Sequence, residues 1–265
     1  MFDFLKKSEV LDDPSVQWLC DCFNWCLGNF DADIFHHNTF LVVPSNEFFP
    51  GKENSIHGMA SLILGQVKQY AGVAHWPTVL VDQRSCQLDV PLRLTNPAFK
   101  RAVKGMVIEG VEGGEALVVP YNPDQVGNPE ALIASFAHTL AQYLASMNNE
   151  PPPGGRENWP QATEVLAVFM GFGLMFTNTA LTFQRGGCGG CGGGANGRTG
   201  SLSQYDITYA LAIFSMLKQI PVKQVTSHMK SALRTYFKYA VKDISKRSEI
   251  HDGMIQFRSN IVSGR

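Results

Sequence analysis

The first half of the chain alternates short apolar runs with turn-rich segments, a pattern typical of β-strands. We predict strands at TFLVV (39–43), TVLV (78–81), DVPLRL (89–94), GMVIEG (105–110) and EALVVP (115–120). Two segments of this half, 14–27 and 55–71, instead repeat apolar residues at helical spacing and predict helices. A sheet is therefore expected between residues 39 and 120.

The second half of the chain is predicted to be helical. Asn128 is suited to cap, and Pro129 to begin, a helix over 130–147. Three further helices are expected, at about 160–183, at about 203–219 and at about 222–246. Ser203 and Asp206 have the spacing of a capping box at the start of the second of these.

Strands followed by helices are typical of an α+β fold and not of alternating βαβ units. We expect one domain over residues 1–265, with a small sheet (39–120) packed against a helical second half (128–246). The glycine-rich segment 186–200 is expected to be a flexible loop. Hydrophobic residues make up 45% of the chain, which suits a globular core. The charged fraction of 17% is below the usual value of about 25% and indicates extensive burial.

Charge and cysteine usage exclude several classes of protein. The net charge of -1 and the pI of about 6.6 give no electrostatic basis for binding nucleic acid. The start, MFDFLKKSEV, lacks the basic region and apolar run of a signal peptide. Without an export signal, the six cysteines are expected to be reduced thiols. We therefore expect a cytoplasmic protein without a nucleic-acid partner.

An uncharged run from Val165 to Gln184 approaches the length of a membrane span. Its two glycines, Asn178 and several threonines lower its hydropathy. We expect a buried central helix and no contact with a membrane. Gly171 and Gly173 are expected to let a neighbouring helix or strand approach closely.

The segment 131–149 contains no Asp, Glu, Lys or Arg. Its polar residues fall mainly on one stripe of the predicted helix: Ser135, His138, Thr139, Gln142 and Ser146. A solvated stripe normally carries charges, so this one indicates a cleft or a buried polar layer. Spacing alone favours a core helix whose polar side chains are all hydrogen-bonded.

The sequence LIASFAHTLAQYL resembles the active-site helix of zincin metallopeptidases, which carries His-Glu-x-x-His. In that motif two histidines one turn apart share a zinc ion, and the glutamate activates the zinc-bound water. Gluzincins add a glutamate from the next helix. The order of LVVPSNEFFP, EALVVPY, the PPGG loop and LSQYDITYALAIF is also similar to a bacterial zincin-like family with an AHELAH-type motif, over about 38–220. The resemblance implies a zincin-like fold.

The motif is degenerate in this chain. By the resemblance, His138 occupies the first ligand position, Thr139 the general-base position and Gln142 the second histidine position, while Glu164 on the next helix matches the third ligand. Threonine is not a carboxylate base near neutral pH, and a neutral amide is a poor zinc ligand. We therefore expect a pseudoenzyme without a cofactor, zinc being the metal if one binds. We also hypothesise that His138, Gln142 and Glu164 pair directly as a polar triad.

The resulting functional expectation is a non-catalytic protein of zinc-metallopeptidase ancestry that binds a peptide or protein partner in the former cleft. In zincins an edge strand such as that at 115–120 pairs with an extended peptide. A second hypothesis is a zinc-dependent hydrolase with a rearranged metal site that uses His228 or His251. The sequence specifies neither a partner nor an oligomeric state.

A third hypothesis is a metal- or redox-responsive protein acting through Cys188 and Cys191, which form Cys-Gly-Gly-Cys. Redox pairs usually lie at a helix start, and zinc sites need further ligands at suitable spacing. This pair lies in a glycine-rich loop, so a flexible insertion is the simpler interpretation. The other cysteines available for a composite zinc site are Cys20, Cys22, Cys26 and Cys86.

Two charged features are interpreted as surface. A basic stripe recurs every fourth residue of the last predicted helix: Lys230, Arg234, Lys238 and Lys242. It is expected to be a solvated face, with binding of an acidic partner as the second interpretation. The polar group Asp31, Asp33, His36 and His37 is expected to lie in a surface loop.

Overall fold

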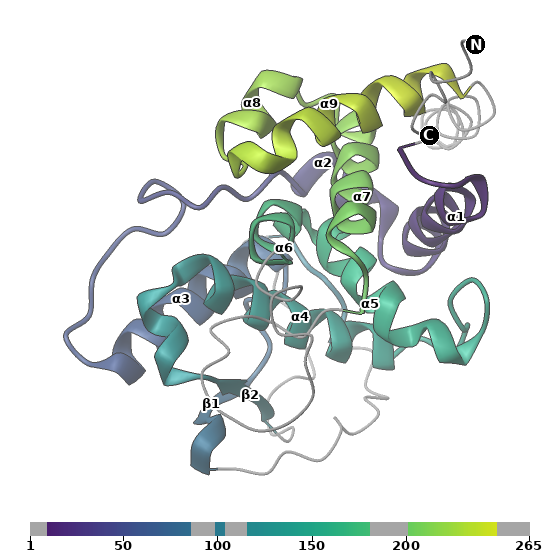
Figure 1. The fold of residues 1–265 in the computed structure, drawn as a ribbon. Coiled ribbons are helices and arrows are strands. Elements are labelled where there is room, and N and C mark those ends of the chain that lie inside the picture. Colours follow the sequence, from purple (N-terminus) through teal and green to yellow (C-terminus); the bar gives the residue numbers. More distant parts are fainter. Residues whose placement is uncertain (1–9, 86–98, 104–115, 181–200, 248–265) are drawn as a thin grey trace, which may run out of the picture.

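The computed structural model describes residues 10–85, 99–103, 116–180 and 201–247. Within these residues the protein is mostly helical and has one sheet of two strands (Figure 1). The first half contains α1 (Asp13–Asn29), α2 (Ala32–Asn38), α3 (Ile56–Ala71), β1 (Thr78–Asp82), η1 (Gln83–Ser85) and β2 (Leu117–Tyr121). The second half contains η3 (Pro123–Gly127), α4 (Pro129–Ser146), η4 (Arg156–Asn158), α5 (Trp159–Ala167), η5 (Val168–Phe172), α6 (Gly173–Thr179), α7 (Gln204–Leu217), α8 (Val222–Ser227) and α9 (Ser231–Lys246). Helices combined with a small sheet agree with the α+β expectation at this level.

The two strands β1 and β2 pair in parallel, with Thr78 opposite Leu117 and Asp82 opposite Tyr121. They confirm the strands expected at 78–81 and 115–120. The strands expected at 89–94 and 105–110, and the loop at 186–200, lie outside the described residues.

The strand expected at 39–43 is wrong. Leu41, Val42 and Val43 are buried, but the segment belongs to no sheet in the described chain. The Val42 N–H instead donates to the carbonyl oxygen of Gly171, at 3.0 Å. This apolar run therefore pairs its backbone with a helix and not with a neighbouring strand.

Local capping signals place several helices as expected. The Asp12 carboxylate accepts from Ser15 N at the start of α1, and Asn128 Oδ1 accepts from Ala131 N at the start of α4. At the start of α7, Ser203 and Asp206 form both hydrogen bonds of the capping box. These contacts satisfy N–H groups that the first turn of a helix leaves without intrahelical partners.

The α5–η5–α6 element confirms the expected burial, but the backbone leaves helical geometry at Gly171, so the single helix expected over 160–183 is wrong. The stretch Arg156–Thr179 is apolar enough to cross a membrane by length and composition, yet its apolar window is completely buried in the protein, as in the core helix of a globular domain. Gly171 has φ 101°, and an added Cβ there would overlap the Phe40 carbonyl oxygen. A Cβ on Gly173 would lie 2.8 Å from Leu211 of α7. Both glycines therefore allow close approach, as predicted.

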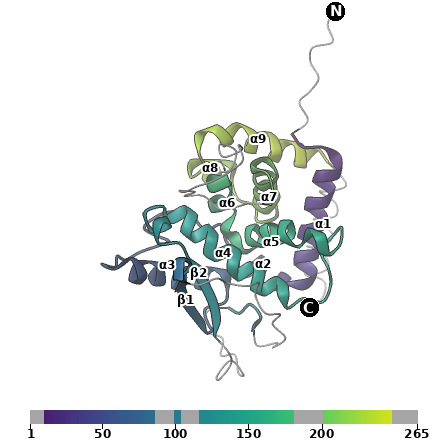
Figure 2. The same cartoon turned by 60° about the horizontal axis from the view of Figure 1, so that its bottom comes forward.

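The helices form successive layers, which Figure 2 shows from the side. The α8–α9 pair covers α7, and α7 packs on α6. Next to them lies α4, with α5 and α6 on one side and α3 and β2 on the other. The first helix, α1, packs against α5 and α7. This arrangement makes α4 the helix that joins the sheet to the helical layers.

The helix expected over 222–246 is two helices, α8 and α9, and the single-helix expectation is wrong. The side chain of Asn178 holds the break, because its Nδ2 donates to His228 O at 2.9 Å and its Oδ1 accepts from Lys230 N at 3.0 Å. The four basic residues of the stripe are exposed, which agrees with the expected surface position. The opposite face is buried and apolar: Val225, Met229, Leu233, Phe237 and Ala240.

The surface loop expected around residues 31–37 is also corrected. Asp31 caps α2, its carboxylate accepting from Ile34 N at 3.0 Å, and Asp33, His36 and His37 lie within that helix. His37 and Asp33 approach to 3.4 Å, one turn apart. A carboxylate at the N-cap favours a helix even in a short polar segment.

Candidate functional site

The polar stripe of α4 is half-buried, whereas nearly all other residues of this helix are fully buried. It comprises Ser135, His138, Thr139, Gln142 and Ser146. A stripe with this exposure and without charge is neither a solvated face nor a sealed core. It therefore marks α4 as the helix on which a cleft or binding face is expected.

The hydroxyl groups of the stripe are held by neighbouring acceptors. Thr139 Oγ1 donates to Ser135 O at 3.1 Å, and Ser146 Oγ donates to Tyr143 O at 2.7 Å. Ser135 Oγ donates to Gln125 Oε1 of η3 at 3.2 Å. Because Thr139 is bonded back to the preceding turn, its side chain serves the helix backbone.

Glu164 lies on α5 and is completely buried. Its Oε1 accepts from Ser201 N at 2.8 Å, and its Oε2 accepts from Leu202 N at 3.1 Å. These two amides belong to the segment that leads into the capping box of α7. The carboxylate therefore anchors the entry to α7 by charge-assisted hydrogen bonds.

The direct pairing hypothesised for His138, Gln142 and Glu164 is not found. Among the described residues, no hydrogen bond or ion pair joins any two of the three. The His138 ring instead lies 6.4 Å from the Phe176 ring of α6, measured between centroids. In the part of the chain that the structure describes, no three His, Cys, Asp or Glu side chains come together as a candidate metal site.

The cysteines and the two more distant histidines lie in different parts of the chain. Cys86, Cys188, Cys191 and His251 lie outside the described residues, and His228 lies between α8 and α9. Cys20, Cys22 and Cys26 are buried free thiols of α1. Burial raises the pKa of Cys20 to about 12 and raises the pKa of Cys22 and of Cys26. Thiols in such surroundings are poor nucleophiles.

We expect the three α1 thiols to resist labelling in the folded protein. Because burial and a raised pKa both suppress the thiolate, Cys20, Cys22 and Cys26 should react with a disulfide reagent at pH 8 at least about 100-fold more slowly than in denaturant. Peptide mapping after timed labelling measures this. The control is the labelling rate of the same cysteine in protein unfolded by urea. Rapid labelling of Cys22 in the folded protein would contradict its burial.

The outer edge of β2 is poorly suited to strand addition. In the parallel register, Val118 and Pro120 direct their backbone groups away from β1. The Val118 carbonyl accepts from Tyr143 OH of α4 at 2.8 Å, and Pro120 has no N–H. Among the described residues, the Val118 carbonyl and the Pro120 nitrogen are thus not available to an extended peptide, and their geometry does not favour the expected mode of partner binding.

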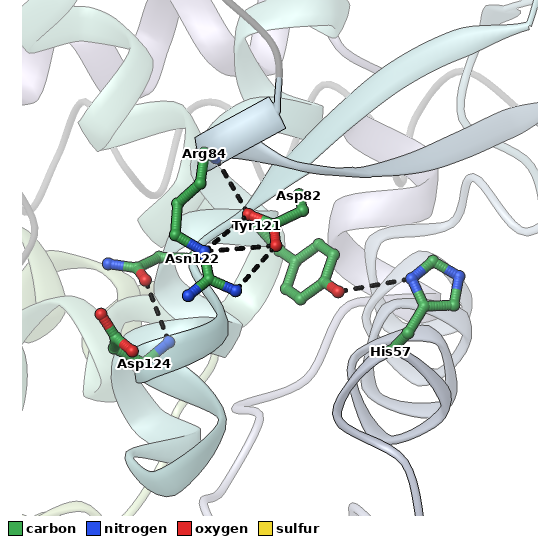
Figure 3. Close-up of polar contacts among 6 residues, drawn as sticks. All are labelled: His57, Asp82, Arg84, Tyr121, Asn122 and Asp124. Carbon is green, nitrogen blue, oxygen red and sulfur yellow. Dashed lines mark hydrogen bonds and ion pairs between the residues drawn. The ribbon is translucent and has the colours of Figure 1, made fainter.

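A polar cluster at the carboxyl ends of β1 and β2 was missed by the sequence-based predictions (Figure 3). Arg84 Nη2 donates to Asp82 Oδ2 at 2.9 Å, and the hydrogen bonds from Arg84 lower the pKa of Asp82. Tyr121 OH lies 3.4 Å from His57 Nδ1. Figure 3 shows Tyr121 between the ion pair and His57.

The signal for this cluster was Asp82 and Tyr121 as the last residues of two parallel strands, where ligands of α/β sheets often bind. Arg84 and His57 are exposed, and Arg84 is already paired with Asp82. The cluster is therefore a surface ion pair beside a tyrosine–histidine contact, and we assign it no role.

Comparison with models of known families, with characterised proteins and with solved structures gives no match for this chain.

Proposed function

We propose that this protein is a non-catalytic, zincin-like binding protein of the cytoplasm that descends from a metallopeptidase. Its ligand is a peptide or protein segment that contacts the half-buried polar stripe of α4. Recognition uses the side chains of His138 and Gln142, since in the described chain the Val118 carbonyl of the neighbouring strand already accepts from Tyr143 OH.

The observation that carries the proposal is the set of hydrogen bonds made by the Glu164 carboxylate. A gluzincin needs the corresponding carboxylate as a metal ligand, whereas both oxygens of this one accept backbone N–H groups. Complete burial and two charge-assisted bonds make the carboxylate costly to redirect. Glu164 is therefore a structural group.

The chemistry of Thr139 supports the same proposal. A hydrolase of this kind requires a carboxylate base beside the first ligand, and the Thr139 hydroxyl has no comparable basicity near neutral pH. Its hydrogen bond to Ser135 O holds it against the helix backbone. A binding face made of half-exposed polar side chains does not require Thr139 or Glu164 to be reactive.

The metal content of the full chain, purified without chelator or added zinc, tests this proposal. We expect less than about a tenth of an equivalent of zinc by elemental analysis, because at most two good ligands of the motif remain. Near-stoichiometric zinc would overturn it. In that case, loss of zinc in His138→Ala would assign a rearranged metal site, and loss in a Cys188→Ser/Cys191→Ser variant would assign the metal to the cysteine pair.

A further inference from the structure

A cavity of about 370 Å³ lies where four chain segments meet, and none of its lining residues belongs to the polar stripe. These are the end of α1, the start of α2, the segment 99–103 and the end of α4. Its lining combines cationic, amide and apolar side chains with one carboxylate: Asn29, Phe30, Asp31, Lys100, Arg101, Leu144, Met147 and Asn148. The volume of this cavity lies in the range of small-ligand sites.

Arg101 is the unusual member of this lining, because only 5% of it is exposed. Its Nε donates to Ala71 O at the end of α3, at 3.0 Å, and its Nη2 donates to Thr39 Oγ1, at 2.8 Å. The guanidinium carbon lies 5.9 Å from the centre of the Phe169 ring. Nη1 is buried and has no protein acceptor among the described residues.

Among the residues that the structure describes, no close anion matches the charge of Arg101. No carboxylate of the described residues forms an ion pair with it, and Asp31, which acts on it at longer range, is itself exposed. Burial consequently lowers the pKa of Arg101 to about 10. A buried cation of this kind gains free energy when an anion comes near, since the protein interior screens the attraction weakly.

Asn148, just after the end of α4, provides a second donor. Its Oδ1 accepts from Glu150 N at 3.2 Å, whereas its buried Nδ2 has no acceptor in the described part of the protein. Two donors without acceptors, Arg101 Nη1 and Asn148 Nδ2, thus belong to residues that line one cavity. Lys100, exposed on the same lining, adds a further positive charge.

We propose that this cavity binds a small ligand through an oxyanion, a carboxylate or a phosphate, which interacts with Arg101, Asn148 and Lys100. The apolar part of the ligand contacts Phe30, Leu144 and Met147. The site is separate from the stripe of α4, so it stands whether or not the stripe binds a partner.

Calorimetric titration and thermal melting of the full chain with inorganic phosphate and with small carboxylates, against chloride at equal ionic strength, test the site. A saturable heat and a rising melting temperature with one class of anion, and none with chloride, are expected, because a ligand that binds only the folded state stabilises it. The phosphate and carboxylate arms show which oxyanion the site prefers. No saturable binding in either arm would overturn the proposal.

Asn148→Asp is the most discriminating variant for this site, because it replaces a hydrogen-bond donor by a negative charge at nearly constant side-chain volume. We expect anion affinity to fall at least about tenfold and the melting temperature without ligand to rise, since the new carboxylate is attracted to Arg101. Lys100→Gln should weaken binding by a smaller factor, and the exposed Lys223→Gln on α8 should leave it unchanged. Equal affinity of the wild type and Asn148→Asp would contradict a site at this cavity, even if Arg101→Gln fails to fold.

Discussion

Replacing Gly171 by alanine should lower the free energy of unfolding by about 3–5 kcal/mol, among the largest effects expected of a single substitution. Gly171 has φ 101°, a conformation that an L-residue adopts only with strain. The added Cβ would also overlap the carbonyl oxygen of Phe40. Relief would require the buried segment 39–43 to move away from η5, which would break the Val42–Gly171 hydrogen bond.

Urea denaturation measures this effect, and Gly65→Ala is the matched control. Gly65 is a solvent-exposed residue in the middle of α3, and a Cβ there would meet nothing within 4 Å. That substitution should stabilise the protein by about 0.5–1 kcal/mol, because alanine favours the helix. Similar midpoints for the two variants would show that Gly171 is not under the constraint described.

The second large effect is expected at Glu164. Glu164→Ala should destabilise the protein by about 3–5 kcal/mol, because the amides of Ser201 and Leu202 lose their acceptors. Glu164→Gln should cost about 1.5–3 kcal/mol, since one carbonyl oxygen remains while the new NH₂ group faces a donor. Exposed Glu157→Ala should stay within about 0.5 kcal/mol.

Denaturation of these three variants by urea, followed by helical circular dichroism, gives the comparison. Wild-type stability in Glu164→Ala would contradict the anchoring role. The proposed function adds a separate readout, because a structural Glu164 predicts equal zinc content in the wild type and in Glu164→Gln. A fall in bound zinc would instead identify Glu164 as a ligand.

Elements with local signals could be predicted from the sequence. Helices α4 and α7 begin at the capping residues expected for them, Asn128 and Ser203, whose hydrogen-bond partners are only three residues away. The close approach at Gly171 and Gly173 also follows from residue type. What the sequence could not specify is the identity of the neighbour, Phe40 in one case and Leu211 in the other.

Elements decided by distant partners were missed. The run 39–43 has strand composition, but its backbone bonds to Gly171, about 130 residues further on. The break between α8 and α9 depends on Asn178, which lies 50 residues before His228. The sequence around 39–43 does not indicate the contact with Gly171, and the sequence around 228–230 does not indicate the contact with Asn178. The local patterns therefore favoured a strand and an unbroken helix.

The features of the candidate site also fall into those with a local signal in the sequence and those that depend on distant partners. The half-buried character of the α4 stripe followed from its lack of charge, a property of that helix alone. The partners of Glu164 are backbone amides, which nearly every residue possesses, so no residue type indicated them. Arg101 and Asn148 lie on segments far apart in sequence, and neither is unusual until folding places both beside one cavity.

The packing of α1 has a consequence for the order of events during synthesis on the ribosome. Its apolar face is covered by α5 and α7, and roughly 130 residues separate the end of α1 from the start of α5. At common rates of translation, that face stays uncovered on the nascent chain for roughly ten seconds. Trp25, Phe23 and the three thiols of α1 are therefore available to chaperones and oxidants in the newborn chain, although the finished protein conceals them.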